Sequence, residues 1–153
     1  MSNSVPVAEL ASLIGDEIGV TDWFEIDQDR VNAFADATLD HQFIHVDPEA
    51  AAATPFGGTI AHGFLTLSLL PMFLQDISPV IEGTLFAMNY GSDKVRFLQP
   101  VKVGSRIRAR NTLAAAEEKR PGQWLIKQTV TMEIEGESKP AMVAEMLSMV
   151  FVQ

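Results

Sequence analysis

The sequence has no cysteine, which excludes disulfide bonds, thiolate metal ligands and a cysteine nucleophile. Its longest apolar stretch, residues 64–74, is well short of the roughly 20 residues that a membrane-spanning helix needs. Residues 1–10 lack the basic and apolar regions of a signal peptide, so we expect none. These absences favour a cytoplasmic protein without a membrane partner.

Basic residues are nearly missing from the first part of the chain. Residues 1–93 hold one basic residue against fourteen acidic ones, a net charge of −13, whereas residues 94–153 hold ten basic and six acidic, a net charge of +4. The formal net charge of −9 would repel a phosphate backbone, so we expect no nucleic-acid partner. The basic part suits either a compact polyanion or an ordinary solvated sheet face.

No repeat, low-complexity tract or linker interrupts the chain, so we expect a single domain over residues 1–153. Apolar residues recur at helical spacing over residues 28–38, behind Asp27 as a suitable N-cap. Asp47 precedes a proline and an alanine run, which predicts a second short helix over residues 48–53.

Residues 63–77 are apolar on every side, which predicts a helix enclosed by other structure. Strand patterns follow it, over residues 85–90, 94–98, 105–115, 124–134 and 141–152. One buried helix followed by an antiparallel meander is an α+β arrangement, in which a curved sheet wraps the long central helix. Such a sheet leaves an edge exposed, and we expect a homodimer to cover it.

The densest polar cluster lies between the two predicted short helices. It contains Asp40 and His45, a carboxylate and an imidazole that can exchange protons with one water molecule near neutral pH. Both side chains also have purely structural interpretations. Asp40 can close the turn after the first helix, and His45 can be a hydrogen-bonded core histidine.

A metal site is the alternative use of these residue types. The potential ligands are Asp40, His41, His45, Asp47 and His62. His41 and His45 would face the same way only on a helix, and the residues Phe43, Ile44, Asp47 and Pro48 argue against a helix there. We therefore expect no metal.

Gly63 stands at the start of the predicted central helix. Backbone N–H groups at a helix start have no partner within the helix, so the Gly63 amide is suited to stabilise a developing oxyanion. Glycine at this position can equally serve tight packing of the helix start.

The motifs together carry a resemblance to a known family. FADATLDHQFIHVD at residues 34–47, PFG at residues 55–57 and IAHGFLTL at residues 60–67 look like the signature of MaoC-like dehydratases and R-specific enoyl-CoA hydratases. Later matches are NYG at residues 89–91, KVRF at residues 94–97 and the Pro100, Val101 and Gly104 pattern. The similarity covers roughly residues 20–150 and is closest to the short, nodulation-protein-N-like branch.

The resemblance implies a homodimeric single hot-dog fold with a pantetheine tunnel near the subunit interface. It implies reversible hydration of trans-2-enoyl-CoA to (R)-3-hydroxyacyl-CoA, with the thioester as substrate and no separate cofactor. The family's catalytic pair falls on Asp40 and His45, and its oxyanion-hole amide on Gly63. We further predict His62, Gln42 and Arg96 as substrate-binding residues, Arg96 toward the phosphates of coenzyme A.

The sequence departs from the family pattern in two places. Leu39 stands where the family usually has glycine, and it would resist a left-handed turn at a cost of about 1 to 2 kcal/mol, so the loop geometry around Asp40 is expected to differ. Gln42 and Phe43 stand where many members have Asn-Pro.

Two other functions compete with hydration: a hot-dog acyl-CoA thioesterase and a non-catalytic acyl-CoA-binding subunit. The absence of a carboxylate over residues 63–74 disfavours the thioesterase.

Overall fold

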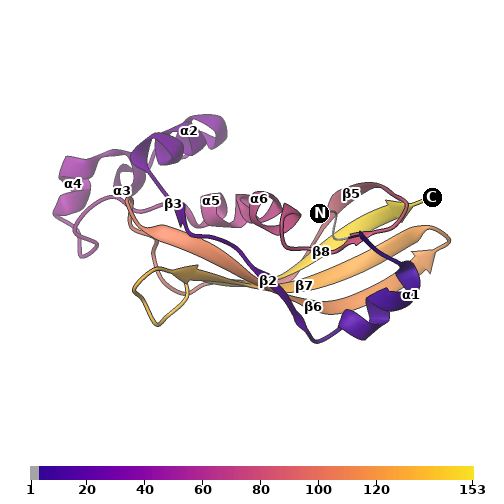
Figure 1. Ribbon diagram of the computed structural model, residues 1–153. Coiled ribbons are helices and arrows are strands. Elements are labelled where there is room, and N and C mark those ends of the chain that lie inside the picture. The colour runs from indigo at the N-terminus through magenta and orange to yellow at the C-terminus, as the bar shows by residue number, and fades with distance from the viewer. Residues whose placement is uncertain (1–3) are drawn as a thin grey trace.

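The computed structural model describes residues 4–153. The segment expected to contain no signal peptide, residues 1–10, therefore lies partly outside the described residues. Its main feature is a curved antiparallel sheet with the strand order β2-β6-β7-β8-β5, in which β3 also pairs with β6 (Figure 1). The strands are β2 (Glu17–Val20), β3 (Phe24–Glu25), β5 (Thr84–Phe97), β6 (Arg106–Arg120), β7 (Gln123–Ile134) and β8 (Met142–Val152).

The central helix lies on one face of this sheet, as predicted, but in two parts. α5 (Gly63–Ser68) and α6 (Leu70–Gln75) are interrupted at Leu69 (Figure 1). Pro71 explains the break, because proline has no amide hydrogen for a helical bond and its ring crowds the preceding turn. The prediction of one continuous helix over residues 63–77 was wrong at this point.

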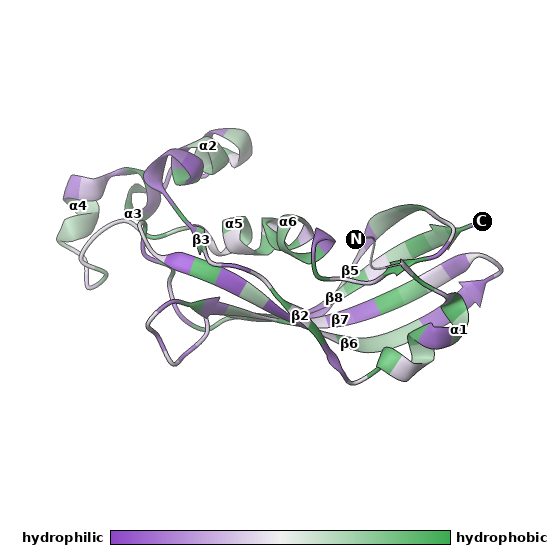
Figure 2. Cartoon of the chain, in the orientation of Figure 1, coloured by the Kyte–Doolittle hydropathy of each residue, from purple (hydrophilic) through white to green (hydrophobic). Residues whose placement is uncertain are grey.

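The sheet and the central helix share the main apolar core. Figure 2 shows α5 and α6 as largely apolar, ending in a hydrophilic turn after α6. The buried residues Leu65, Leu70 and Phe73 pack in one cluster with Val130 and Met132 of β7. The helix is not enclosed on every side within one chain, however, because Phe64 is 67% exposed. Over residues 4–153, no helix combines the length and the hydropathy needed to cross a membrane.

Three short helices extend beyond the start of α5 (Figure 1): α2 (Gln28–Thr38), α3 (Phe43–Val46) and α4 (Pro48–Ala52). The predicted caps are present: the Asp27 side chain accepts from the Arg30 amide at 2.8 Å, and the Asp47 side chain accepts from the Ala50 amide at 3.0 Å. The argument against a helix in the segment between α2 and α4 was wrong, because α3 forms a single helical turn there. His41 precedes that turn and is not aligned with His45 on it.

The strand predictions differ from the structure mainly at β5 and at the N-terminus. The two segments predicted at 85–90 and 94–98 form one strand, because register shifts keep β5 paired with β8 throughout. The short N-terminal elements were not predicted, since periodicity needs longer segments. They are β1 (Ser4–Val5), α1 (Val7–Leu10), η1 (Ala11–Leu13), β2 and β3. The two-residue strand β4 (Val80–Ile81), which is parallel to β1, was not predicted either.

Leu39 ends α2 in the left-handed conformation, with φ 63° and ψ 24°. It is the only residue other than glycine with a positive φ within residues 4–153. The left-handed turn before Asp40 therefore forms even though leucine replaces the usual glycine. The Leu39 side chain is 81% exposed, so little packing offsets the backbone strain.

Replacing Leu39 with glycine is expected to raise the free energy of unfolding by about 1 kcal/mol relative to Leu39→Ala. Alanine is the matched control, because it removes the same exposed side chain and keeps the Cβ that makes the left-handed conformation costly. Urea denaturation of both variants measures the difference. Equal stability of the two would show that the turn is not strained.

Candidate active site

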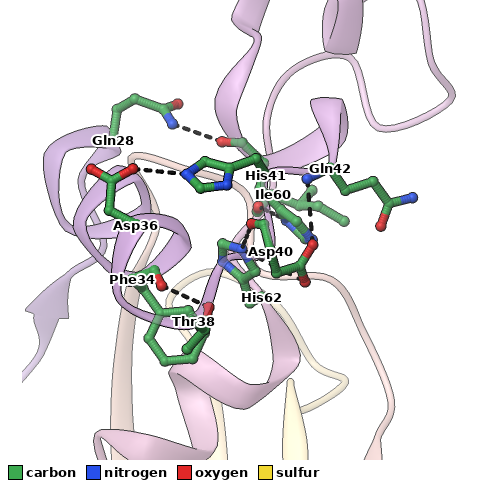
Figure 3. Close-up of polar contacts among 10 residues, drawn as sticks. Gln28, Phe34, Asp36, Thr38, Asp40, His41, Gln42, Ile60 and His62 are labelled. Carbon is green, nitrogen blue, oxygen red and sulfur yellow. Dashed lines mark hydrogen bonds and ion pairs between the residues drawn. The ribbon is translucent and has the colours of Figure 1, made fainter.

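The fold brings three side chains from three segments to one place, and Figure 3 shows two of them, Asp40 and His62, side by side. Asp40 follows the left-handed end of α2, His45 lies on α3, and His62 is the N-cap of α5. A carboxylate oxygen of Asp40 and one ring nitrogen of each histidine all lie within 4.8 Å of one another. One water molecule can span such a separation with two hydrogen bonds of about 2.8 Å each.

His45 is held in one tautomer by the backbone. Its ring is buried, and its Nδ1 lies 2.7 Å from the carbonyl oxygen of Ile60. Because a carbonyl only accepts, Nδ1 must carry the hydrogen and donate it. In the neutral ring Nε2 then keeps its lone pair, which is the atom that a general base needs.

A second set of bonds fixes the backbone of His45. Gln28 Nε2 donates to the His45 carbonyl oxygen at 2.7 Å, and the Thr59 hydroxyl donates to Gln28 Oε1 at 2.6 Å. Gln28 therefore ties the start of α2 to both α3 and the segment before α5. The sequence contains no signal for this role, because Gln28 is one polar residue at the start of a helix, 17 positions from His45.

His62 contacts both candidate residues. Its ring stacks on that of His45, with centroids 3.8 Å apart and an angle of 23° between the planes, and Phe34 lies on it at 4.9 Å. His62 Nε2 donates to the backbone carbonyl of Asp40 at 3.0 Å. Its Nδ1 is buried without a hydrogen-bond partner within residues 4–153. Since it is only 3% exposed, His62 is placed to hold its neighbours in position.

The Asp40 carboxylate itself faces outward, with its side chain 54% exposed. One of its oxygens accepts from the backbone amide of Gln42 at 3.3 Å, whereas the Gln42 side chain points away from the cluster (Figure 3). His41 turns instead toward Asp36, with 2.8 Å between His41 Nε2 and Asp36 Oδ1. The predicted pair is thus brought together, while His41 is kept out of it.

The same cluster has the residue types of a metal site, but its geometry disfavours one. An imidazole binds a metal in the plane of its ring at about 2.0–2.1 Å. The rings of His45 and His62 are nearly parallel and 3.8 Å apart, so no nearby point lies in both planes. One nitrogen of each ring also already donates to a carbonyl.

A cavity of about 330 Å³ adjoins this cluster, and His45, Gly63 and Thr66 line it together with Phe97 of β5. As the first residue of α5, Gly63 has an amide without an acceptor inside the helix. A Cβ added at Gly63 would lie 3.1 Å from ring atoms of Phe97, so glycine also serves close packing here. Arg96 is exposed and donates to the carbonyl of Val95, beside Phe97 but outside the cavity lining.

This fold and cluster define a class: an α+β protein in which a carboxylate and a histidine with a free Nε2 meet at the start of a helix on a curved sheet. A model of the MaoC-like domain matches residues 9–137. The chain belongs to the MaoC-like dehydratase family.

Similar proteins support this assignment. The chain is 54% identical over 139 residues to 3-hydroxyacyl-thioester dehydratase Z of Mycobacterium tuberculosis (strain ATCC 25618 / H37Rv), covering 91% of each. It is 46% identical over 147 residues to Nodulation protein N of Rhizobium meliloti (strain 1021), covering 95% of this chain and 91% of that relative. The solved (R)-hydratase from A. caviae involved in PHA biosynthesis aligns with a TM-score of 0.70 and 25% identity, covering 87% of this chain and 95% of that one.

These comparisons confirm two predictions from the sequence. The fold is the expected α+β hot-dog fold, shared with solved structures that align over 92% and 94% of this chain. Relatives named as dehydratases and hydratases place the chain in the class of hydro-lyases.

Proposed function

We propose that the protein is an (R)-specific enoyl-CoA hydratase, which adds water reversibly to trans-2-enoyl-CoA and gives (R)-3-hydroxyacyl-CoA. The arrangement that supports this most directly is the pairing of Asp40 with His45, whose free Nε2 and buried ring adjoin the cavity that Gly63 lines. Residues 1–153 act as one domain in this proposal, and the thioester is the substrate without a further cofactor.

In the proposed reaction, Asp40 and His45 hold one water molecule between them. His45 Nε2 takes a proton from the water molecule while the water oxygen forms a bond to C3 of the enoyl chain. The electron pair of the C2–C3 double bond moves toward the thioester oxygen, where the Gly63 amide donates to the developing negative charge. The pair then delivers a proton to C2, which restores both groups and completes the addition of water.

The coenzyme A part of the substrate carries phosphates, for which the basic C-terminal part of the chain supplies charge. Arg96 is the proposed contact, because it is exposed and adjacent in sequence to Phe97 of the cavity. Gln42 contributes its backbone amide to Asp40, and its exposed side chain is free to meet the substrate.

We further propose that the protein works as a homodimer in the cytoplasm. β5 is an edge strand of the sheet, and an edge with exposed apolar side chains is suited to pair with a second copy. Leu85 is 62% exposed, Met88 55% and Tyr90 63%. Phe64 of α5, which is 67% exposed, contacts Phe97 of the same strand and extends this apolar surface.

The test of the proposed function follows two signals at once with crotonyl-CoA and longer trans-2-enoyl-CoAs. Loss of the conjugated enoyl-thioester absorbance reports hydration, and a thiol reagent reports free coenzyme A. Absorbance loss without thiol release, with an (R) product on chiral analysis, is the expected result. Thiol release would instead identify a thioesterase. No change at any chain length would contradict the hydratase and favour an acyl-CoA-binding subunit.

His62→Phe is expected to lower kcat for hydration about tenfold to a hundredfold while KM changes little. Phenylalanine keeps a ring against His45 but cannot donate to the Asp40 carbonyl, so the aspartate loop loses its anchor. The kinetic constants on crotonyl-CoA measure the effect. His62→Gln retains a donor and is expected to recover part of kcat. If the phenylalanine variant has wild-type kcat, the bond does not position Asp40.

A further inference from the structure

We propose that the far end of the central helix carries a separate polar site, which binds a hydroxyl or a similar neutral hydrogen-bonding group on the acyl chain. The inference rests on the proposed function, because it names the class of acyl chain that the proposed hydratase would favour. Its residues are Ser78, which follows α6, Asn111 of β6 and Gln128 of β7.

These three side chains form a hydrogen-bonded cluster on the helix-facing side of the sheet, in which Asn111 and Gln128 are buried and Ser78 is half-buried. Gln128 Nε2 donates to Ser78 Oγ at 2.7 Å, and Asn111 Nδ2 donates to the same oxygen at 3.2 Å. Asn111 is fully buried and Gln128 is only 7% exposed. Polar side chains are costly at such inward-facing sheet positions, where apolar residues would pack equally well.

The cluster retains hydrogen-bonding capacity that the protein does not use. Ser78 Oγ accepts two bonds, which leaves its own hydrogen to be donated, and Asn111 Oδ1 is buried without a partner within residues 4–153. Gln128 Oε1 is a further acceptor, and turning its amide by half a rotation would exchange acceptor for donor. A hydroxyl group both donates and accepts, so it matches the Ser78 hydroxyl and the Gln128 amide, the two members of the cluster that line cavities.

Two adjoining cavities, with volumes of about 260 Å³ and about 180 Å³, open onto Ser78 and Gln128, while Asn111 lies behind them and lines neither cavity. Ser78 and Gln128 line both cavities, as do Ala87 and Ser148. Neither lining includes a charged side chain, so the site suits a neutral group rather than a carboxylate or an amine. The remaining lining is mainly apolar, as the hydrocarbon part of an acyl chain requires.

The position of these cavities relates them to the candidate active site. Thr66 lines the cavity beside His45, while Leu70 and Leu74 line the cavity at the far end. These residues follow one another at intervals of four, so they lie along one side of the central helix. Gly63 and Leu74 are about 17 Å apart along such a helix. A long acyl chain whose thioester lies at Gly63 would therefore place its distal end near Gln128.

The test compares saturated acyl-CoAs in pairs of equal chain length, one ending in a methyl group and the other in a hydroxyl, over a series of lengths. Calorimetry of the wild-type protein is expected to show the hydroxyl compound binding about tenfold more tightly at one length. In an ordinary apolar tunnel the methyl compound would bind more tightly at every length, because the hydroxyl would lose its bonds to water.

Gln128→Met and Ser78→Ala are expected to reduce this preference to about one. The matched control is Gln123→Met, the same change on the same strand but outside both cavities, and it should keep the wild-type ratio. Two substitutions are used so that a folding defect in one leaves the other informative, and thermal unfolding of each variant checks this.

The inference is overturned if neither compound binds, if the methyl compound binds at least as well at every length, or if the preference survives both substitutions. Hydration of crotonyl-CoA by the wild-type protein, measured separately, tests the proposed function. Its four-carbon chain is too short to reach the polar site. A hydroxyl preference without hydration would support the polar site and contradict the proposed hydratase function. Hydration without the hydroxyl preference would support the hydratase function and contradict the polar site.

Discussion

Asp40→Asn and His45→Gln are each expected to lower kcat for hydration of crotonyl-CoA about a thousandfold, because each removes one member of the pair that holds the water and moves its proton. Both replacements nearly preserve side-chain shape. Asparagine cannot carry the negative charge of Asp40. Glutamine cannot replace the two ring nitrogens of His45, of which Nδ1 donates to the Ile60 carbonyl while Nε2 acts as the base. The loss of enoyl-thioester absorbance measures kcat in each variant.

The chain offers a matched control beside the site. Asp36→Asn and His41→Gln make the same chemical changes in an exposed pair a few residues away, and both variants should stay within about twofold of wild type. The variant Asp40→Asn/His45→Gln should be little slower than either single variant, because the two groups act as a unit. Wild-type rates in the single variants would exclude both residues from the chemistry.

Leu85→Lys/Tyr90→Lys is expected to convert the protein from a dimer to a monomer, weakening self-association about a hundredfold or more. Both side chains are exposed on β5, and a dimer that pairs along this edge would bury the new charges without partners. Sedimentation equilibrium measures the change against a chain mass of 16.7 kDa.

Ile14→Lys is the control for this experiment. Ile14 is 42% exposed and apolar but lies outside β5, so its replacement should leave the dimer intact. A wild-type protein that sediments as a single chain would contradict the proposed dimer directly. Dissociation by Ile14→Lys would place the interface elsewhere on the molecule.

The features that sequence reasoning predicted correctly are those encoded within a few neighbouring residues. The caps at Asp27 and Asp47 accept bonds from amides three positions ahead, so helices α2 and α4 were predictable from local residue types. The alternation along β7 likewise reports burial on one face of a regular strand. Such signals depend on the chain near each residue and hardly on the rest of the fold.

Features that depend on tertiary context were predicted poorly. The sequence around residues 91–93 resembles a turn, yet pairing with β8 carries β5 through it with shifts in register. The break in the central helix is a different case, because Pro71 is a local signal and the largely apolar pattern of residues 63–74 was followed instead. α3 was missed because one helical turn is too short to leave a periodic pattern.

The candidate site divides in the same way. Asp40 and His45 lie within one motif, so their proximity could be anticipated from the sequence and from its resemblance to a family. The groups that orient them are long-range contacts: Ile60 is 15 positions from His45, and His62 is 22 positions from Asp40. Backbone carbonyls have no residue-type signature, and the stacking of two histidines becomes visible only when the fold joins α3 to the start of α5.

The placement of α2, α3 and α4 beyond the end of the central helix affects how heat would inactivate the protein. Gln28 joins α2 to α3 through the backbone of His45, and Asp40 lies between these two helices, so Asp40 and His45 belong to one small helical unit. We expect this unit to open at a lower temperature than the five-stranded run from β2 to β5 separates. Catalysis would then stop at a temperature below the melting of the sheet, and cooling would restore it without any strand having to pair again.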